Sequence, residues 1–136
     1  MCLIIKKNQK LKTAKEDMIV FKKFYFRDGE LISSIMGTRY ELGKLYTAEI
    51  KLSPDQIAFD TREITAAQIK YKNYRDECDF VGAGFHSATT KERYTEAIGD
   101  TIAECIIPKG SLYYKGLTDL LVSNQIIIKK IIWNKA

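Results

Sequence analysis

The stretch Gly82–Gly116, GAGFHSATTKERYTEAIGDTIAECIIPKGSLYYKG, combines more interpretable features than any other part of the chain. It begins with a glycine-rich run that contains the single histidine, His86, and it continues into a helix signal, an apolar strand and a proline turn. Thr89 and Glu92 have the spacing of a capping box, in which two side chains accept hydrogen bonds from backbone N–H groups at a helix N-terminus. The pattern therefore predicts a short helix over residues 90–99.

The glycine-rich run 82–87 precedes the N-terminus of this predicted helix. Backbone N–H groups and the positive end of the helix dipole would face the run, and such a terminus can bind an anion, including a nucleotide phosphate. We therefore take Gly84 as a candidate ligand-binding residue. The alternative is that the glycines only form a tight turn into the helix.

Composition favours one globular domain over residues 1–136. The chain is 46% hydrophobic and 29% charged, with a net charge of +5, which is typical of an ordinary globular protein. No apolar run approaches the ~20 residues that cross a membrane. The apolar start at residues 1–5 is too short for a signal-peptide core. We expect a cytoplasmic protein without membrane association.

Cysteines and lysines exclude some classes of site. The three cysteines are far apart and form no CxxC pair, so neither a disulfide framework nor a metal site is expected. Lysines gather near both ends of the chain, and would form one basic face if the terminal strands paired. The cluster has no arginine and no interleaved aromatic residue for base stacking. A solvated lysine-rich loop is therefore favoured over a nucleic-acid interface.

Secondary-structure signals indicate an α+β fold. The segment Asp17–Arg27 is rich in β-branched and aromatic residues and reads as a central strand, and Asp28-Gly29 predicts a tight hairpin back to a second strand over 30–36. A capping box formed by Thr65 and Gln68 predicts a helix over 65–75. Further strands are expected over residues 2–6, 40–52, 101–107, 111–115 and 125–133. The sum is a mixed, mostly antiparallel sheet of about five to seven strands with two helices.

Three side chains are candidates for catalysis or ligand binding. His86 would suit a general base near neutral pH, although a lone loop histidine is more often structural. Glu104 lies on a predicted buried strand, where a carboxylate needs a partner, such as Lys22, or belongs to a site. Tyr113 could line a nucleobase pocket or could simply be a core residue.

Two segments together resemble the mono-ADP-ribosyltransferase fold. The run Gly84-Phe85-His86-Ser87-Ala88-Thr89-Thr90 resembles its Phe-x-Ser-Thr-Ser segment, and Glu104-Cys105-Ile106-Ile107-Pro108-Lys109-Gly110 resembles its glutamate-containing strand. The resemblance implies binding of NAD or another nucleotide by Ser87 and Thr89, with Glu104 as the catalytic glutamate. His86 is a second candidate catalytic residue on its own chemistry, as a general base. Ala88 replaces the family's central threonine, and Lys22 replaces an arginine that makes planar bidentate contacts. A degenerate, nucleotide-binding version of the fold is the interpretation we carry forward, and it predicts a cleft formed by the 84–89 loop, Lys22 and Glu104.

The chain also resembles, over most of its length, a family of small uncharacterised proteins of gut bacteria and their phages. The shared features are the start Met1-Cys2-Leu3, the run Gly84-Phe85-His86 before a helix, and the turn Ile107-Pro108-Lys109-Gly110. This resemblance implies an alternative function, in which a phage or mobile-element protein binds a host protein. Whether the chain is an enzyme stays open at this point.

Overall fold

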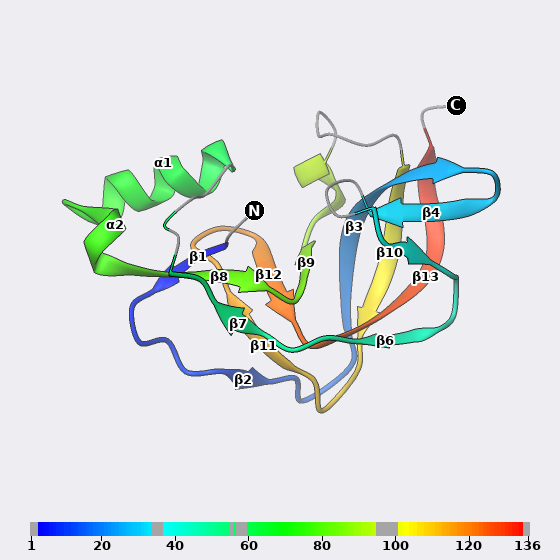
Figure 1. The fold of residues 1–136 in the computed structure, drawn as a ribbon, viewed down its shortest axis with the longest axis horizontal. Helices are drawn as coiled ribbons and strands as arrows, with labels where there is room; N and C mark the ends of the chain where they lie inside the picture. The colour runs from blue at the N-terminus through cyan, green and yellow to red at the C-terminus, as the bar shows by residue number, and fades with distance from the viewer. Residues whose placement is uncertain (1–2, 34–36, 55, 57–59, 95–100, 135–136) are drawn as a thin grey trace.

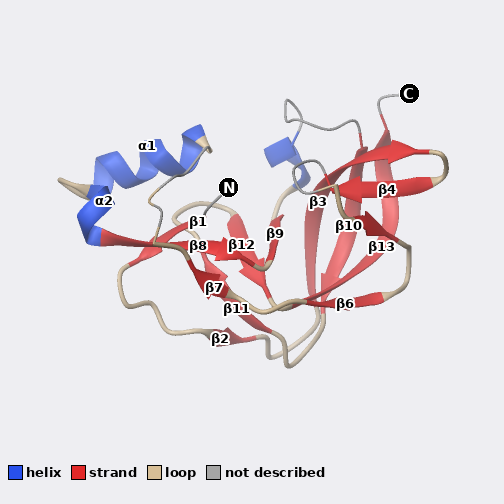
Figure 2. Cartoon of the chain, viewed as in Figure 1, coloured by secondary structure: helices blue, strands red, loops and turns tan. Residues whose placement is uncertain are grey.

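The computed structural model describes residues 3–33, 37–54, 56, 60–94 and 101–134, which form two antiparallel sheets and a few helical segments (Figures 1 and 2). The larger sheet has ten strands: β2 (Lys12–Thr13), β3 (Met18–Arg27), β4 (Glu30–Ser33), β5 (Arg39–Tyr40), β6 (Leu45–Thr47), β9 (Phe85–Ala88), β10 (Thr101–Ile107), β11 (Leu112–Lys115), β12 (Leu120–Ser123) and β13 (Gln125–Asn134). The smaller sheet has three: β1 (Leu3–Lys6), β7 (Lys51–Leu52) and β8 (Cys78–Ala83). The α+β class is confirmed, whereas the prediction of five to seven strands was too low.

Strand β3 organises the larger sheet, as its sequence predicts. Its residues 18–24 pair with the whole of β10, and the strand also pairs with β4 and β9. Asp28 and Gly29 have φ values of 53° and 78°, which is the positive-φ pair that a two-residue type I′ hairpin requires. The path of the sheet is β2-β11-β12-β9-β3-β10-β13-β6, with β4 and β5 beside β3.

The glycine-rich run is part of two strands, so the prediction of a loop was wrong. Residues 78–83 form β8, residues 85–88 form β9, and Gly84 joins them with φ of 126°. The two strands belong to different sheets, so Gly84 is where the chain crosses from one sheet to the other. Alternating apolar residues on both sides of the glycine explain why pairing prevails over a loop.

The helix predicted over 65–75 begins and ends earlier. Helix α1 spans Thr61–Lys70, and the carboxylate of Asp60 caps it by accepting from the N–H groups of Arg62 and Glu63 at 3.0 and 3.2 Å. A separate turn of helix, α2, spans Tyr74–Glu77. The Thr65 capping box therefore lies inside α1, because Asp60, five residues earlier, supplies the cap.

The helix predicted over 90–99 is a single 3₁₀ turn, η1 (Lys91–Tyr94), in its described part. Residues 95–99 lie outside the described residues. Thr89 does not act as predicted within this part of the chain: its hydroxyl donates to the carbonyl of Asp119 at 3.4 Å. The predicted anion-binding helix N-terminus is therefore not formed by the described residues.

The remaining strands follow the predictions with two exceptions. The strands near 2–6, 101–107, 111–115 and 125–133 are present as β1, β10, β11 and β13, and β4 covers residues 30–33 of the predicted 30–36, of which 34–36 lie outside the described residues. The strand expected over 40–52 is divided into β5, β6 and β7, with Gly43 at φ of 78° between the first two. Strands β2 and β12 were not predicted, although all four residues of β12 are buried.

Three apolar clusters lie between the layers. The main one lines the inner face of the larger sheet and includes Val20, Phe24 and Ile128. A second lies between the smaller sheet and β9 and β12, and a third lies between the smaller sheet and the helices. Leu3 and Ile5 face the second cluster and Ile4 faces the third, as the period of two of a strand requires. Neither α-helix of the described chain has the length and apolar character that a membrane span needs.

Candidate functional site

The sheet separates the residues that the sequence predicted would form one cleft. Lys22 lies opposite Ala103 on neighbouring strands, and Glu104 lies opposite Phe21. Because side chains alternate along a strand, Lys22 points to the inner face with Val20 and Phe24 of the main core, whereas Glu104 points to the outer face. The predicted cleft containing Lys22 and Glu104, and the suggested ion pair between them, are therefore not formed.

Lys22 lies against the apolar core. Its ammonium donates to the carbonyl oxygen of His86 at 2.8 Å and lies 5.9 Å from the centroid of the Phe24 ring. Burial lowers the pKa of Lys22 to about 8, with a smaller lowering from Lys23 and an opposing contribution from Cys105. The charged form is therefore poorly accommodated in the folded chain.

His86 lies on strand β9 and not in a loop. Its Nδ1 is 3.3 Å from the carbonyl oxygen of Gly84, and its buried Nε2 has no hydrogen-bond partner among the described residues. Burial, followed by the nearby charge of Lys22, lowers the pKa of His86 to about 4. The imidazole is consequently neutral at physiological pH, where a base with so low a pKa would be weak.

Ser87 and Tyr113 occupy core positions. Ser87 is fully buried, and its Oγ has no hydrogen-bond partner in the described part of the chain. Tyr113 lies opposite Ser123 and packs at the edge of the main core. Three strands separate its strand, β11, from the strand of Glu104, so Tyr113 does not share a site with that carboxylate.

Gly84 has a packing role that the structure makes plain. A Cβ at this position would lie 2.4 Å from Cγ1 of Val122, and the φ of 126° is one that L residues rarely adopt. We expect Gly84→Ala to destabilise the fold by about 2 kcal/mol or more, from strain and overpacking together. Urea unfolding measures this, and Gly43→Ala is the control because its added Cβ would meet no atom within 4 Å. Equal effects of the two substitutions would show that the close approach to Val122 is unimportant.

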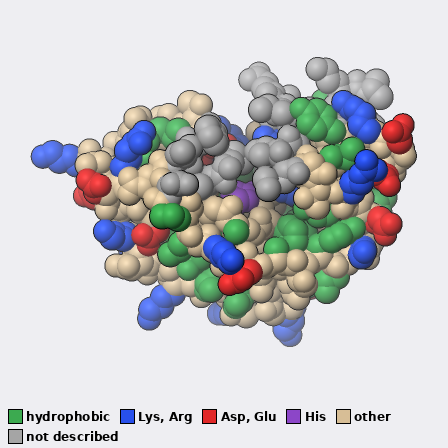
Figure 3. Space-filling model, viewed as in Figure 1, with side chains coloured by type: hydrophobic (Ala, Val, Ile, Leu, Met, Phe, Trp, Pro, Cys, Tyr) green, Lys and Arg blue, Asp and Glu red, His purple; other side chains and the backbone are tan. Residues whose placement is uncertain are grey.

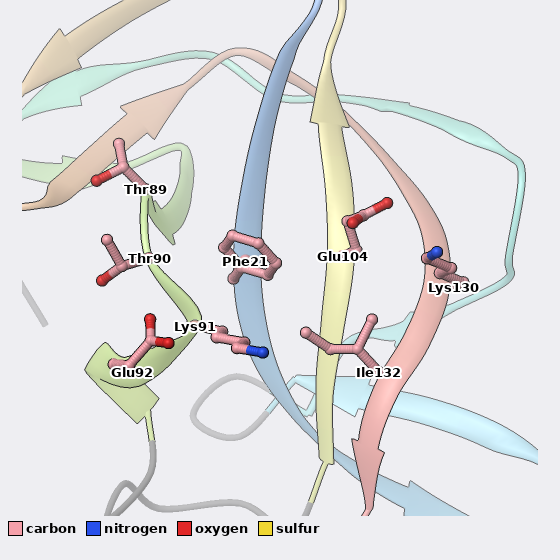
Figure 4. Close-up of a pocket in the computed structure, with 8 residues that line it drawn as sticks. All are labelled: Phe21, Thr89, Thr90, Lys91, Glu92, Glu104, Lys130 and Ile132. Carbon is pink, nitrogen blue, oxygen red and sulfur yellow. The ribbon is translucent and has the colours of Figure 1, made fainter.

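Two of the predicted residues, Thr89 and Glu104, do come together, in an open groove on the outer face of the larger sheet (Figure 4). The groove has a volume of about 370 Å³. Its lining residues come from β3, β9–η1, β10 and β13, and they are Phe21, Thr89, Thr90, Lys91, Glu92, Glu104, Lys130 and Ile132. The floor is therefore the strand surface, and one wall is the segment that leads into η1.

The groove combines an aromatic surface with charges of both signs. Figure 4 shows Lys91 extending from η1 toward β3, with Phe21 next to it and Lys130 beyond Glu104. Neither lysine makes an ion pair with another described residue, whereas Glu104 lies 3.6 Å from Nζ of Lys129. The Glu104 side chain is 17% exposed, which leaves its carboxylate partly accessible. Two cationic groups are thus available beside an aromatic ring.

A buried ion cluster fixes the wall of the groove. The backbone N–H of Thr89 donates to the carbonyl of Asp119 at 2.8 Å, and the hydroxyl of Thr90 donates to the Asp119 carboxylate at 2.9 Å. Arg93, only 2% of whose side chain is exposed, pairs with Asp119 and also with Asp60 at 2.5 Å. The segment 89–93 is therefore fastened to the loop after β11 and to the start of α1.

Glu63 completes this cluster. Its side chain is 1% exposed, lies 3.9 Å from Nη2 of Arg93, and accepts from the N–H groups of Leu117 and Thr118 at 3.0 Å each. One guanidinium thus lies among three carboxylates. These carboxylates also accept hydrogen bonds from backbone N–H groups and from hydroxyl groups. This arrangement is typical of a structural network that positions a loop.

Four residues of the groove and its wall were not predicted from the sequence: Phe21, Lys91, Lys130 and Arg93. Strand alternation does place Phe21 on the face opposite Val20, but only the register of β3, β10 and β13 shows that Lys130 lies beside Glu104. No local signal marks Arg93, because its three partners are distant in sequence.

The basic residues are not gathered on one face. Strand β1 pairs with β8, and β13 pairs with β10 and β6, so the terminal strands lie in different sheets and do not unite the two lysine clusters. Figure 3 shows lysines and arginines spread around the periphery, with acidic side chains between them on this side of the molecule.

No group of three or more metal-ligating side chains occurs among the described residues. Cys78 and Cys105 are free and buried, and burial raises the pKa of Cys105 to about 12. Comparison of the chain with protein-family models, curated proteins and solved structures finds no match. The groove on the outer face is therefore the candidate site that the geometry itself provides.

Proposed function

We propose that the chain is a nucleotide-binding module and that the groove on the outer face holds the nucleotide. The observation that carries this proposal is the placement of an aromatic ring, Phe21, between two lysines that lack ion-pair partners in the described chain. A nucleotide has a flat base that stacks on an aromatic ring and a phosphate that ammonium groups bind. The groove volume of about 370 Å³ lies in the range of small-ligand sites.

The lining residues divide naturally among the parts of such a ligand. Phe21 and Ile132 offer apolar surface to the base. Lys91 and Lys130 offer charge to the phosphates. The hydroxyl of Thr89 and the carboxylate of Glu104 offer hydrogen-bond acceptors to ribose hydroxyls. NAD and ADP-ribose are included in this ligand class.

The proposal is one of binding, with catalysis left out. Of the residues that the transferase resemblance implies, Thr89 and Glu104 line the groove, whereas Ser87 is buried and Lys22 points to the inner face. Oxocarbenium stabilisation would need the glutamate together with the other nucleotide-binding groups at one place. Glu104→Gln is therefore expected to weaken the Kd for ADP-ribose, and isothermal titration calorimetry measures the change.

Removal of a groove lysine tests the proposal. We expect Lys91→Gln and Lys130→Gln each to weaken the Kd for ADP-ribose about tenfold, because each removes a charged hydrogen bond to phosphate worth about 1.5–3 kcal/mol. Isothermal titration calorimetry measures the Kd. Lys12→Gln is the matched control, since Lys12 is an exposed residue on β2 at the far edge of the sheet.

The competing explanations give different results in the same experiment. Equal loss of affinity in all three lysine variants would indicate a diffuse charge effect and would contradict a built site. Tighter binding of a short oligonucleotide than of ADP-ribose, with affinity falling steeply as salt rises, would indicate a nucleic-acid surface in place of a nucleotide groove. Absence of binding by every nucleotide would contradict the proposal outright.

A further inference from the structure

A row of aliphatic side chains crosses the outer face of the larger sheet beside the groove. Ile106 lies opposite both Ile19 and Ile127, and Ile127 lies opposite Leu45. Directly paired residues share a face, so these four residues form one continuous row over β3, β10, β13 and β6. Their neighbours in sequence, including Val20, Cys105, Ile126 and Tyr46, pack on the main core, which places the row on the outer face.

The row is accessible. Ile19 is 57% exposed and Leu45 is 47% exposed, and Ile106 and Ile127 between them are partly exposed. Single exposed aliphatic residues are ordinary, but four in register across neighbouring strands form a contiguous apolar strip. Such a strip offers a partner protein one continuous line of apolar contact.

The shape of the row limits what can cover it. Four strands at a spacing of about 4.8 Å give a strip about 14 Å long and one residue wide. A second sheet would need a broad apolar face, whereas an amphipathic helix offers one narrow apolar stripe. At 1.5 Å per residue, about ten residues of helix would cover the strip.

The charged residues beside the row indicate which charge a bound helix would carry along its flank. On one side, next to Ile106 and Ile127, the outer face carries Lys129 and Lys130, both exposed, beside the mostly buried carboxylate of Glu104. On the other side the row is followed by the uncharged pair Gln125 and Thr47 and by the exposed Asp17, which precedes β3 and accepts from the N–H of Lys109 at 2.9 Å, so positive charge lies along the first side only. A helix with acidic residues along one flank is therefore complementary to this surface, and a second copy of this lysine-bearing face is not.

We propose that the Ile19–Ile106–Ile127–Leu45 row is a docking surface for an acidic amphipathic helix of a partner protein. The proposal does not rest on nucleotide binding, because no residue of the row lines the groove. Helix binding would bury the aliphatic strip and would bring the acidic flank onto Lys129.

The test uses two synthetic helical peptides with leucines at i, i+3, i+4 and i+7, one with a glutamate flank and one with a lysine flank. We expect the acidic peptide to bind and to shift the methyl NMR signals of Ile19, Ile106 and Ile127. Replacement of both exposed residues, Ile19→Ser and Leu45→Ser, should weaken its Kd at least tenfold. Lys129→Glu should weaken it as well.

Ile69→Ser is the control, because Ile69 is 82% exposed on α1, outside the row. Three results would overturn the proposal: equal affinity for the basic peptide, methyl shifts confined to residues outside the row, or failure of both peptides to bind. Self-association of the chain that Ile19→Ser abolishes would also overturn it, since a second copy would then be the occupant.

Discussion

Arg93→Met should destabilise the chain by about 3–5 kcal/mol, which is the largest loss of stability that we expect from a single substitution. Its side chain is 2% exposed and pairs with Asp60, Glu63 and Asp119. Removal of the guanidinium leaves Glu63, which is 1% exposed, and the mostly buried Asp60 and Asp119 without the cation that they share. Urea unfolding at neutral pH measures the loss.

The pH dependence of that loss tests its electrostatic cause. Burial alone would raise the pKa of Asp60 and of Asp119, but hydrogen bonds and nearby charge, Arg93 prominent among them, lower both pKa values overall. In the natural chain this stabilisation is present above the ordinary carboxyl pKa and is lost as pH falls through the lowered values. In the variant the unpaired carboxylates are relieved when they are protonated, so the difference between the two proteins should shrink on acidification.

The control is Arg39→Met. Arg39 pairs with Glu30, but its side chain is 70% exposed, and an exposed ion pair contributes about 0–1 kcal/mol. Equal losses of stability in the two variants would show that the buried cluster is not what holds segment 89–93 in place.

Lys22→Met should stabilise the chain by about 2 kcal/mol at pH 7. The pKa of Lys22 is lowered from 10.5 to about 8 by burial, and a shift of that size corresponds to about 3 kcal/mol of penalty on the charged form. Loss of the hydrogen bond to the carbonyl of His86 offsets about 1 kcal/mol of the gain. Methionine fills a similar volume without a charge.

The difference in free energy of unfolding between Lys22→Met and the natural chain should decrease as pH rises from about 8 to 10.5. In this window the unfolded chain still binds the lysine proton whereas the folded chain has released it, so the stability of the natural chain rises with pH. The variant lacks this contribution. Lys10→Met, at an exposed position, controls for other titrating groups, and a Lys22→Met effect that is constant across the window would contradict a depressed lysine pKa.

The elements that sequence predicted correctly are those with strong local signals. The apolar segment 18–27 and the Asp28-Gly29 pair determine a strand and a hairpin by themselves. The errors arose where tertiary contacts prevail over a local pattern. The Thr65 capping box is superseded by Asp60, and the glycine-rich run pairs with two different sheets instead of forming a loop.

The candidate site was predicted only in part, because a single sequence gives no strand register. Thr89 and Glu104 line the groove, but Lys22 and Glu104 occupy opposite faces of the sheet. A one-residue difference in pairing exchanges the two faces, so the partners of Glu104 could not be inferred without the strand register. His86 attracted attention as the only histidine, yet its burial on β9 gives it a pKa of about 4.

Amide NMR of the labelled protein, titrated with ADP-ribose, tests the nucleotide groove most directly. We predict saturable shifts at residues 89–92 and at Phe21, Glu104 and Lys130, with little change at Tyr113. Shifts centred on Lys22, His86 and Ser87 would instead place the ligand on the opposite side of the sheet, and an unchanged spectrum at millimolar ADP-ribose, AMP and NAD would contradict nucleotide binding.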